Sequence, residues 1–160
     1  TERNTIVMQD GSAISNLVVG FETKSWFDLN GSLIFTGYES SGHRNKVYSI
    51  KSQFVEQLGN FDVEYWQEFD NNLFISGLNK ESGSYQFYKF KDENILFLKD
   101  NIKIVNVVKV KGSYYFIDAI DKDPDSKKFD SRILLIYDDV SRDFYMVKAG
   151  MQISDMLYVY

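Results

Sequence analysis

Short apolar runs alternate with polar turns along the whole chain. Four such runs, rich in Phe, Tyr, Ile and Leu, follow one another at Glu64–Phe69, Leu73–Leu78, Tyr85–Phe90 and Ile95–Leu98. The residues between them include Asp, Asn and Gly, which close tight hairpin turns. Aromatic and β-branched residues in short runs at this spacing predict four antiparallel strands.

The same pattern occurs twice, about forty residues apart. "NGSLIFTGYE" begins at Asn30, and "NNLFISGLNK" begins at Asn71. In this register Trp26 matches Trp66 and Gly37 matches Gly77, and most neighbouring matches preserve size and polarity. The stretch Ser52–Phe61 has a helix-type cap and a glycine stop, but the repeat aligns it with a strand. We therefore expect a strand there.

A third copy begins at "KGSYYFIDAI", with about six extra residues in the following "DKDPDSKKFD". In this alignment Tyr114, Tyr115 and Phe116 take the places of Leu73, Phe74 and Ile75. The two ends of the chain are similar to parts of a unit. We divide the chain into a partial unit 1–24, units 25–62, 63–103 and 104–150, and a partial unit 151–160.

A β-propeller blade typically consists of four strands in roughly forty residues, which is the pattern seen in this chain. The sequence therefore predicts one all-β domain, 1–160, built from repeated four-stranded antiparallel units. The incomplete units at the two ends predict a partial ring or a fragment of a larger propeller, because an open blade would leave strand edges exposed.

The repeated rhythm L-[FI]-[FI]-[ST]-G … [VF]-Y-x-[IF]-K resembles β-propeller blades over most of the chain. The "GH…WD" pairs of WD40 repeats and the double glycine of kelch repeats are missing. The last stretch, "ILLIYDDVSRDFYMVKAGMQISDMLYVY", also resembles the final blade of structural propellers in phage tails and virions. These resemblances imply a propeller-like fold and a virion or tail component.

Composition narrows the function classes. The formal net charge is −5, so binding to nucleic acid or to anionic membranes is not expected. The chain has no cysteine, which excludes disulfides, thiolate zinc sites and a cysteine nucleophile. It also lacks an apolar run of the roughly 20 residues that a membrane-spanning helix needs, so no membrane insertion is expected.

An acidic stretch offers a candidate metal site. Asp121, Asp123 and Asp125 alternate as at the start of a calcium loop, where carboxylates surround a hard cation. Ser126 stands where an EF-hand has glycine, and Arg132 stands where it has the bidentate glutamate. The alternative is a solvated hairpin loop without any cofactor.

Six further residues are candidate binding positions. The sole histidine, His43, and its neighbour Arg44 lie in a predicted hairpin tip, where a solvated turn is a better interpretation than catalysis. Trp26 and Trp66 recur at one unit position, which favours packing between blades, with a glycan platform as the alternative. Consecutive tyrosines in strands must point to opposite faces, so some of them reach solvent or a partner; the candidates are Tyr114 and Tyr145.

We therefore expect a non-enzymatic binding or scaffold module that contacts a protein or glycan through loops gathered on one rim, at 39–46, 79–84 and 118–130. Two alternatives stay open: a fragment of a glycan-active propeller enzyme, with two carboxylates in one pocket, and a calcium-stabilised extracellular module. The sequence is compatible with an oligomer under each of these interpretations. An extracellular or virion-associated location is favoured.

Overall fold

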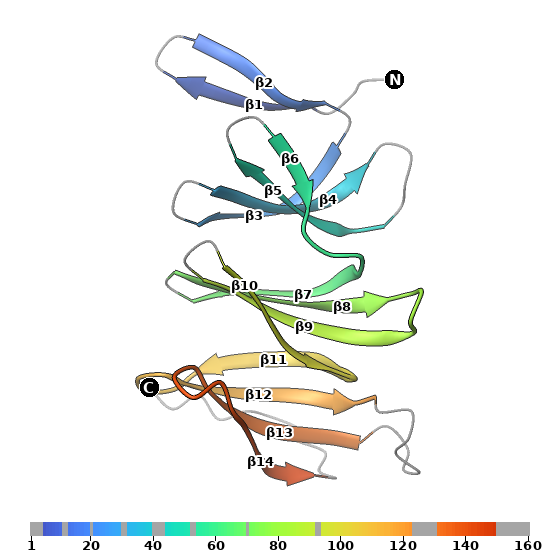
Figure 1. Ribbon diagram of the computed structural model, residues 1–160, viewed down its shortest axis with the longest axis vertical. Helices are drawn as coiled ribbons and strands as arrows, with labels where there is room; N and C mark the ends of the chain where they lie inside the picture. The colour runs from blue at the N-terminus through green and yellow to red at the C-terminus, as the bar shows by residue number, and fades with distance from the viewer. Residues whose placement is uncertain are drawn as a thin grey trace.

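The computed structural model describes the backbone of residues 5–10, 13–19, 21–29, 32–39, 44–51, 54–69, 71–91, 94–122 and 131–149. In these residues every regular element is a β-strand (Figure 1). No helix occurs in these residues. They therefore contain no helix that is long and apolar enough to cross a membrane. The expected all-β fold is confirmed.

The strands form one hairpin and three four-stranded antiparallel sheets, each with its strands in chain order. The hairpin pairs β1 (Thr5–Asp10) with β2 (Ala13–Val19). We call the three larger sheets the first, middle and last sheets. The first sheet comprises β3 (Phe21–Leu29), β4 (Ser32–Glu39), β5 (Lys46–Lys51) and β6 (Phe54–Gln57). The middle sheet comprises β7 (Asp62–Phe69), β8 (Asn72–Asn79), β9 (Ser84–Lys91) and β10 (Asn94–Asp100). The last sheet comprises β11 (Ile102–Lys109), β12 (Tyr114–Asp121), β13 (Ser131–Asp138) and β14 (Phe144–Ala149).

These sheets are the predicted blade-like units, and the expected strand at Ser52–Phe61 is present as β6. Figure 1 shows the sheets stacked along the long axis, with the hairpin at one end and the last sheet at the other. The order and antiparallel pairing within each sheet are those of a propeller blade. The stack is therefore a partial, propeller-like arrangement.

The repeat includes a backbone irregularity as well as a sequence pattern. The first strand of each sheet carries a β-bulge, at Thr23/Ser25, Val63/Tyr65 and Ile104/Asn106. A bulge adds one unpaired residue and increases the local twist of the strand. Since it recurs at one unit position, it bends all three sheets in the same way.

The second strand of the third copy, β12, lies one residue later than the alignment predicted. Phe74 packs in the cluster between the middle and last sheets, whereas Tyr115, its predicted counterpart, points from the last sheet back towards the middle one. The backward-pointing residue of the middle sheet is Leu73, which packs against the first sheet. Tyr115 therefore matches Leu73, and Phe116 matches Phe74. A one-residue shift transfers a side chain to the opposite face of its sheet.

A longer turn causes this shift. In the middle sheet Phe69 pairs with Asn72, so two residues form the turn. In the last sheet the Val110 N–H donates to the Tyr114 carbonyl over 2.9 Å, so the turn has three residues. The additional position is used by Gly112, whose φ of 68° favours glycine.

The core consists of apolar layers between the sheets. Between the first and middle sheets lies the first layer, whose buried residues are Phe27, Ile34, Val47, Phe61, Leu73, Ile75 and Phe90. Between the middle and last sheets lies the second layer, with Phe74, Phe87, Ile102, Ile104, Val107, Tyr115, Ile117, Ala119, Ile133, Leu135 and Tyr137. The middle sheet is thus covered on both faces, and Leu73, Phe74 and Ile75 are fully buried in succession.

Candidate functional site

The last sheet has a face turned away from the middle sheet, which we call the outer face. The strand registers align one row of side chains across it: Val108 beside Phe116, Phe116 beside Ile136, and Ile136 beside Tyr145. Tyr114 lies on the same face, because it is two residues from Phe116. The outer face therefore carries an apolar and aromatic row.

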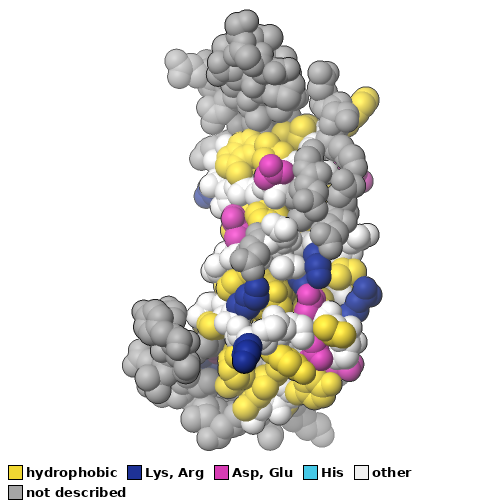
Figure 2. Space-filling model, turned by 90° about the vertical axis from the view of Figure 1, so that its left-hand side faces the viewer, with side chains coloured by type: hydrophobic (Ala, Val, Ile, Leu, Met, Phe, Trp, Pro, Cys, Tyr) yellow, Lys and Arg dark blue, Asp and Glu magenta, His cyan; other side chains and the backbone are white. Residues whose placement is uncertain are grey.

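This row is only partly covered. Phe116 and Ile136 are half-buried, while Tyr114 and Tyr145 are 46% and 52% exposed. The matching residue of the middle sheet, Phe74, is fully buried by the last sheet. Figure 2 shows hydrophobic side chains gathered at the end of the molecule where the last sheet lies. Large apolar patches on soluble proteins mark interaction surfaces.

An ion pair lies within the outer face. Arg132 donates from Nε to Oδ1 of Asp118 over 2.7 Å, and a second guanidinium nitrogen contacts the other carboxylate oxygen. Asp118 is 2% exposed, and its hydrogen bonds raise the pKa of Arg132 above the ordinary value. The bidentate pair gives the buried Asp118 carboxylate a cationic partner within the outer face.

β14 is the terminal strand of the last sheet and exposes three consecutive apolar residues. Tyr145, Met146 and Val147 are 52%, 62% and 50% exposed. Because side chains alternate along a strand, this exposure affects both faces as well as the edge. Among the described strands, nothing pairs with the outer edge of β14.

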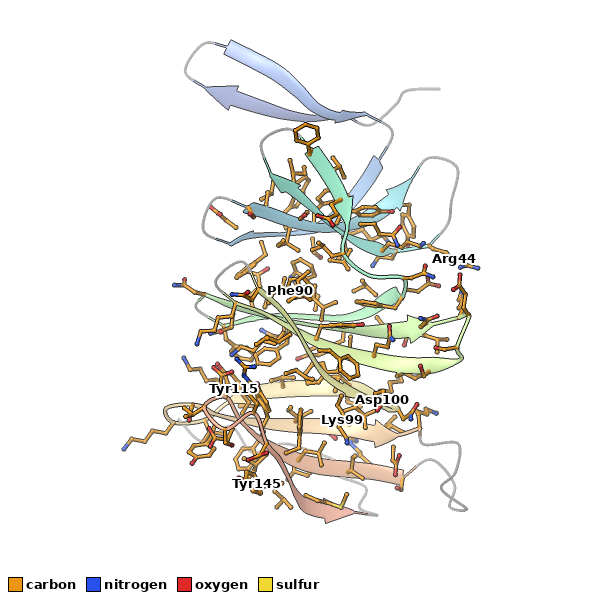
Figure 3. All side chains as sticks on the ribbon, viewed as in Figure 1. Arg44, Phe90, Lys99, Asp100, Tyr115 and Tyr145 are labelled. Carbon is orange, nitrogen blue, oxygen red and sulfur yellow. The ribbon has the colours of Figure 1, made fainter. Side chains whose placement is uncertain are left out.

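A cleft of about 270 Å³ adjoins the same strand. Its apolar wall comes from β11, β13 and β14: Ile102, Ile133, Leu135, Phe144 and Met146. Its polar part comes from the end of β10, the residue after it and the end of β12: Lys99, Asp100, Asn101 and Asp121. The Lys99 ammonium lies 5.9 Å from the centre of the Phe144 ring. Figure 3 labels Lys99 and Asp100, which lie where β10 approaches the last sheet.

A buried cation joins the middle and last sheets. Lys89 is fully buried, forms an ion pair with Asp139, and lies over the rings of Phe74 and Tyr115 at 5.7 and 5.6 Å. Burial acts to raise the pKa of Asp139, but the hydrogen bond and charge of Lys89 and the charge of Lys91 outweigh it. The pKa of Asp139 therefore lies below its ordinary value.

The structure places only some of the predicted binding residues together. Tyr114 and Tyr145 share the outer face of the last sheet. Arg44 is exposed near the rim formed by the ends of β4, β8 and β12, which Figure 1 shows on one side. His43 lies outside the described residues. Its proposed role stays a prediction.

The two tryptophans occupy equal positions in their sheets. Trp26 pairs with Phe35 and stacks on its ring at 5.2 Å, with 37% of its surface exposed. Trp66 packs against the layer between the first and middle sheets, and its indole N–H donates to Glu68 over 2.8 Å. The Trp66 contact is compatible with packing between blades, whereas the Trp26 contact is with a residue of its own sheet. The glycan-platform alternative stays untested.

The calcium hypothesis also stays a prediction. Asp121 ends β12 and faces the cleft, whereas Asp123 and Asp125 lie outside the described residues. Within those residues, no group of three or more acidic or histidine side chains is arranged to hold a metal ion. A melting temperature that falls on addition of a calcium chelator would support the hypothesis.

Sequence reasoning missed the cleft, the Lys89–Asp139 pair and the Asp118–Arg132 pair. The partners of the Lys89 pair are fifty residues apart along the chain. A weak signal for this pair was available: Lys89 interrupts an apolar run in "SYQFYKFK" at a position that faces the neighbouring sheet. No comparable signal pointed to the cleft, since its lining comes from five strands.

Comparison with known proteins adds little. No family model and no curated protein matches the sequence. The structure is similar to the crystal structure of the N-terminal domain of Nup159, with 11% sequence identity and a TM-score of 0.48. The match covers 91% of this chain but only 43% of that one. A TM-score this low supports no conclusion about function, and the match does not support the likeness to phage-tail and virion propellers.

Proposed function

We propose that the protein is a non-enzymatic scaffold module that binds another protein through the outer face of its last sheet. One observation carries this proposal: Phe116 is half-buried, while Phe74, at the same position of the middle sheet, is fully buried by a neighbouring sheet. The partner we propose is therefore a protein that presents the apolar face of an antiparallel sheet.

The energetics favour such a partner. Burial of an exposed aromatic or aliphatic side chain contributes about 1.5–3 kcal/mol, and the outer face offers several in one row. The buried Asp118 already has its cationic partner in Arg132, so covering this carboxylate does not leave it unpaired. A sheet packed on this row would repeat the packing between the middle and last sheets.

The test combines self-association with site-specific crosslinking. A photoreactive amino acid replaces Tyr114 or Tyr145 in the full chain, and a matched control replaces the exposed Phe97 of β10. We expect protein adducts from positions 114 and 145 and none from position 97. Sedimentation velocity of the purified chain shows whether the partner is a second copy. If neither a specific adduct nor self-association is found, the proposal is wrong.

A second candidate function is glycan hydrolysis in the cleft. The observation that favours it is that two carboxylates, Asp100 and Asp121, line one concave site. Glycosidases use such a pair as acid and as base or nucleophile. Release of reducing sugar from mixed oligosaccharides by the wild type, abolished in Asp100→Asn and Asp121→Asn, would support hydrolysis and contradict the scaffold proposal.

A further inference from the structure

We propose that the hairpin β1–β2 is the second half of an incomplete unit, and that the edge of β1 accepts an extended strand of a partner protein. This site lies at the opposite end of the stack from the outer face (Figure 1). The inference therefore goes beyond the proposed function and does not depend on it.

The hairpin has the backbone layout of the third and fourth strands of a unit. In β1–β2, as in β9–β10, two residues separate the paired ends of the two strands. The fifth residue of β2, Leu17, is left out of the pairing, and so is the fifth residue of β10, Leu98. One residue lies between β2 and β3, as between β10 and β11. The strands β1 and β2 therefore correspond to β9 and β10.

The described strands include no counterpart of β8 beside β1. In the middle sheet β9 pairs with β10 on one side and with β8 on the other, and β5 and β13 are also paired on both sides. Among the described strands β1 pairs with β2 alone. An unpaired edge of this kind is a template for an added strand, which gains affinity from backbone hydrogen bonds.

The first sheet shows where the other half of the unit would pack. On the face turned away from the middle sheet, Trp26 of β3 is 37% exposed and Leu33 of β4 is half-buried. The counterparts of Leu33, which are Leu73 and Tyr115, are 0% and 2% exposed, because another sheet covers them. On the same face the apolar residues of β5, and Phe35 of β4 beside them, are buried. The partly open area thus lies over β3 and the start of β4, where the first and second strands of a complete unit would lie.

The chain itself shows what such a strand contains. In the first and middle sheets, the second strand turns one large apolar residue and, two places later, one short polar residue towards the next sheet: Ile34 and Thr36, and Phe74 and Ser76. The centre of the Phe74 ring lies 4.9 Å from that of Tyr115, the counterpart of Leu33. We therefore expect the added strand to place a large apolar residue over Leu33 and a short polar residue two positions later.

This pattern also identifies the kind of partner. In a second copy of this chain, the strands that carry the pattern, β4 and β8, are already paired on both sides, and so is β12. None of these strands can be donated without breaking its own sheet. The partner is therefore a different protein that presents an extended segment with the same pattern.

Alternate residues of β1 direct their backbone groups to the open edge. The residues that flank a two-residue hairpin turn form a bonded pair, so Asp10 bonds with Ala13. Bonded and non-bonded pairs alternate along an antiparallel ladder. The N–H and C=O groups of Gln9 and Val7 therefore point away from β2, whereas those of Met8 point towards it.

The test uses a fluorescent peptide with the sequence of residues 62–79, the first and second strands of the middle sheet. It is titrated into the full chain and followed by anisotropy. In one variant peptide, Phe74→Lys puts a charge on the face that would pack on the first sheet; in the other, Leu73→Lys puts it on the opposite face. We expect Phe74→Lys to weaken binding at least about tenfold, and Leu73→Lys to change it by no more than about twofold.

Hydrogen exchange of the wild-type chain supplies the second readout. The peptide is expected to slow amide exchange at Val7 and Gln9 and to leave Met8 little changed. Gln9→Pro removes one outward-pointing N–H at an edge position where proline is tolerated, whereas Gln9→Ala keeps it. We expect about tenfold weaker binding for Gln9→Pro and a much smaller loss for Gln9→Ala.

Each outcome bears on the inference. Absence of peptide binding, equal losses from the two variant peptides, or binding without protection of Val7 and Gln9 overturns strand addition at β1. Self-association of the chain alone in sedimentation velocity, with protection of the same two amides, would make a second copy the occupant and contradict a different partner. Crosslinking from Tyr114 is expected to persist when the peptide is bound. If no crosslink forms but the peptide still protects Val7 and Gln9, the outer-face proposal fails and strand addition stands.

Discussion

The middle and last sheets share one unit pattern but differ in how much of it is buried. In the middle sheet Leu73, Phe74 and Ile75 are fully buried, since sheets cover both faces. In the last sheet Tyr115 and Ile117 are buried against the middle sheet, while Phe116 between them is only half-buried. Each of these two units therefore has two apolar faces. The second face is buried only where another sheet packs against it.

The two layers between sheets also differ in chemistry. The layer between the first and middle sheets is apolar and includes the stacked rings of Phe61 and Tyr88, whose centres are 5.1 Å apart. The layer between the middle and last sheets is also largely apolar but contains the buried Lys89 and its partner Asp139. Apolar packing allows several registers, whereas a buried ion pair is satisfied in one. We infer that this pair fixes how the last sheet sits on the middle one.

The largest effect is expected from Asp139→Ala. It leaves the buried Lys89 without its carboxylate, and loss of one partner of a buried pair lowers the free energy of unfolding by about 4 kcal/mol. Chemical denaturation measures this change. Replacement of both residues by apolar ones, Lys89→Met with Asp139→Leu, is expected to restore most of the loss. Equal losses in the single and double variants would contradict the assigned role.

The same pair predicts an acid dependence. Because the pKa of Asp139 is lowered in the fold, its stabilising contribution is present above the ordinary value of 3.8 and is lost as the pH falls through the folded value. The wild type is therefore expected to lose stability below about pH 4 more steeply than the double variant. Parallel acid limbs would contradict this.

A smaller effect is expected from Gly77→Ala. A Cβ at this position would lie 1.9 Å from the carbonyl oxygen of Asp62 and 2.9 Å from the Phe61 ring. The matching position of the last sheet holds Ala119, and the residue there that corresponds to Phe61 is the smaller Ile102. Steric strain is expected to lower the free energy of unfolding by about 2 kcal/mol. Wild-type stability of the variant would show that the sheets are less closely packed than described.

Tyr65→Phe is expected to lower the free energy of unfolding by about 1 kcal/mol, because it removes a hydrogen bond between the middle and last sheets. The Tyr65 hydroxyl oxygen accepts a hydrogen bond from the Val107 N–H over 2.8 Å and so links the middle and last sheets. Burial raises the pKa of Tyr65 to about 12, although this hydrogen bond acts to lower it. A raised tyrosine pKa means that stability is present below pH 10 and falls between about pH 10 and 12. The variant is expected to show a shallower alkaline limb in denaturation at several pH values; an unchanged limb would contradict the assignment.

The smallest effect on the free energy of unfolding is expected from an exposed ion pair between the middle and last sheets. Lys103 of β11 pairs with Glu64 of β7 over 2.7 Å, and both side chains are more than one-third exposed. Such pairs are screened by solvent and salt. Glu64→Gln is expected to lower the free energy of unfolding by about 0.3 kcal/mol at low salt, and by less at high salt. A loss near that of Asp139→Ala would mean that surface charge, and not the buried pair, holds the sheets together.

The strands of the middle sheet were predictable because their alternating pattern is local. Glu64–Phe69 was predicted where β7 runs from Asp62 to Phe69, and Leu73–Leu78 where β8 runs from Asn72 to Asn79. The register of β12 was not predictable from alignment alone, since one additional turn residue before it, at Gly112, moves the side chains of that strand to the opposite face.

The candidate site was predictable only in part. Tyr114 and Tyr145 were selected because neighbouring aromatic residues in a strand point to opposite faces and cannot all be buried, and both lie on the outer face. The cleft beside β14 depends on how β10 crosses the last sheet, which is a property of packing between distant segments. No pattern within one strand indicates that Asp100 and Met146 line the same space.

The central claim is that one unit pattern has a covered face in the middle sheet and an open one in the last sheet. Because the chain has no cysteine, single cysteines can report this directly by their rate of reaction with a thiol reagent. We predict that Ser76→Cys, buried between the middle and last sheets, reacts slowly and that Tyr145→Cys reacts rapidly. Equal rates for the two thiols would contradict the account.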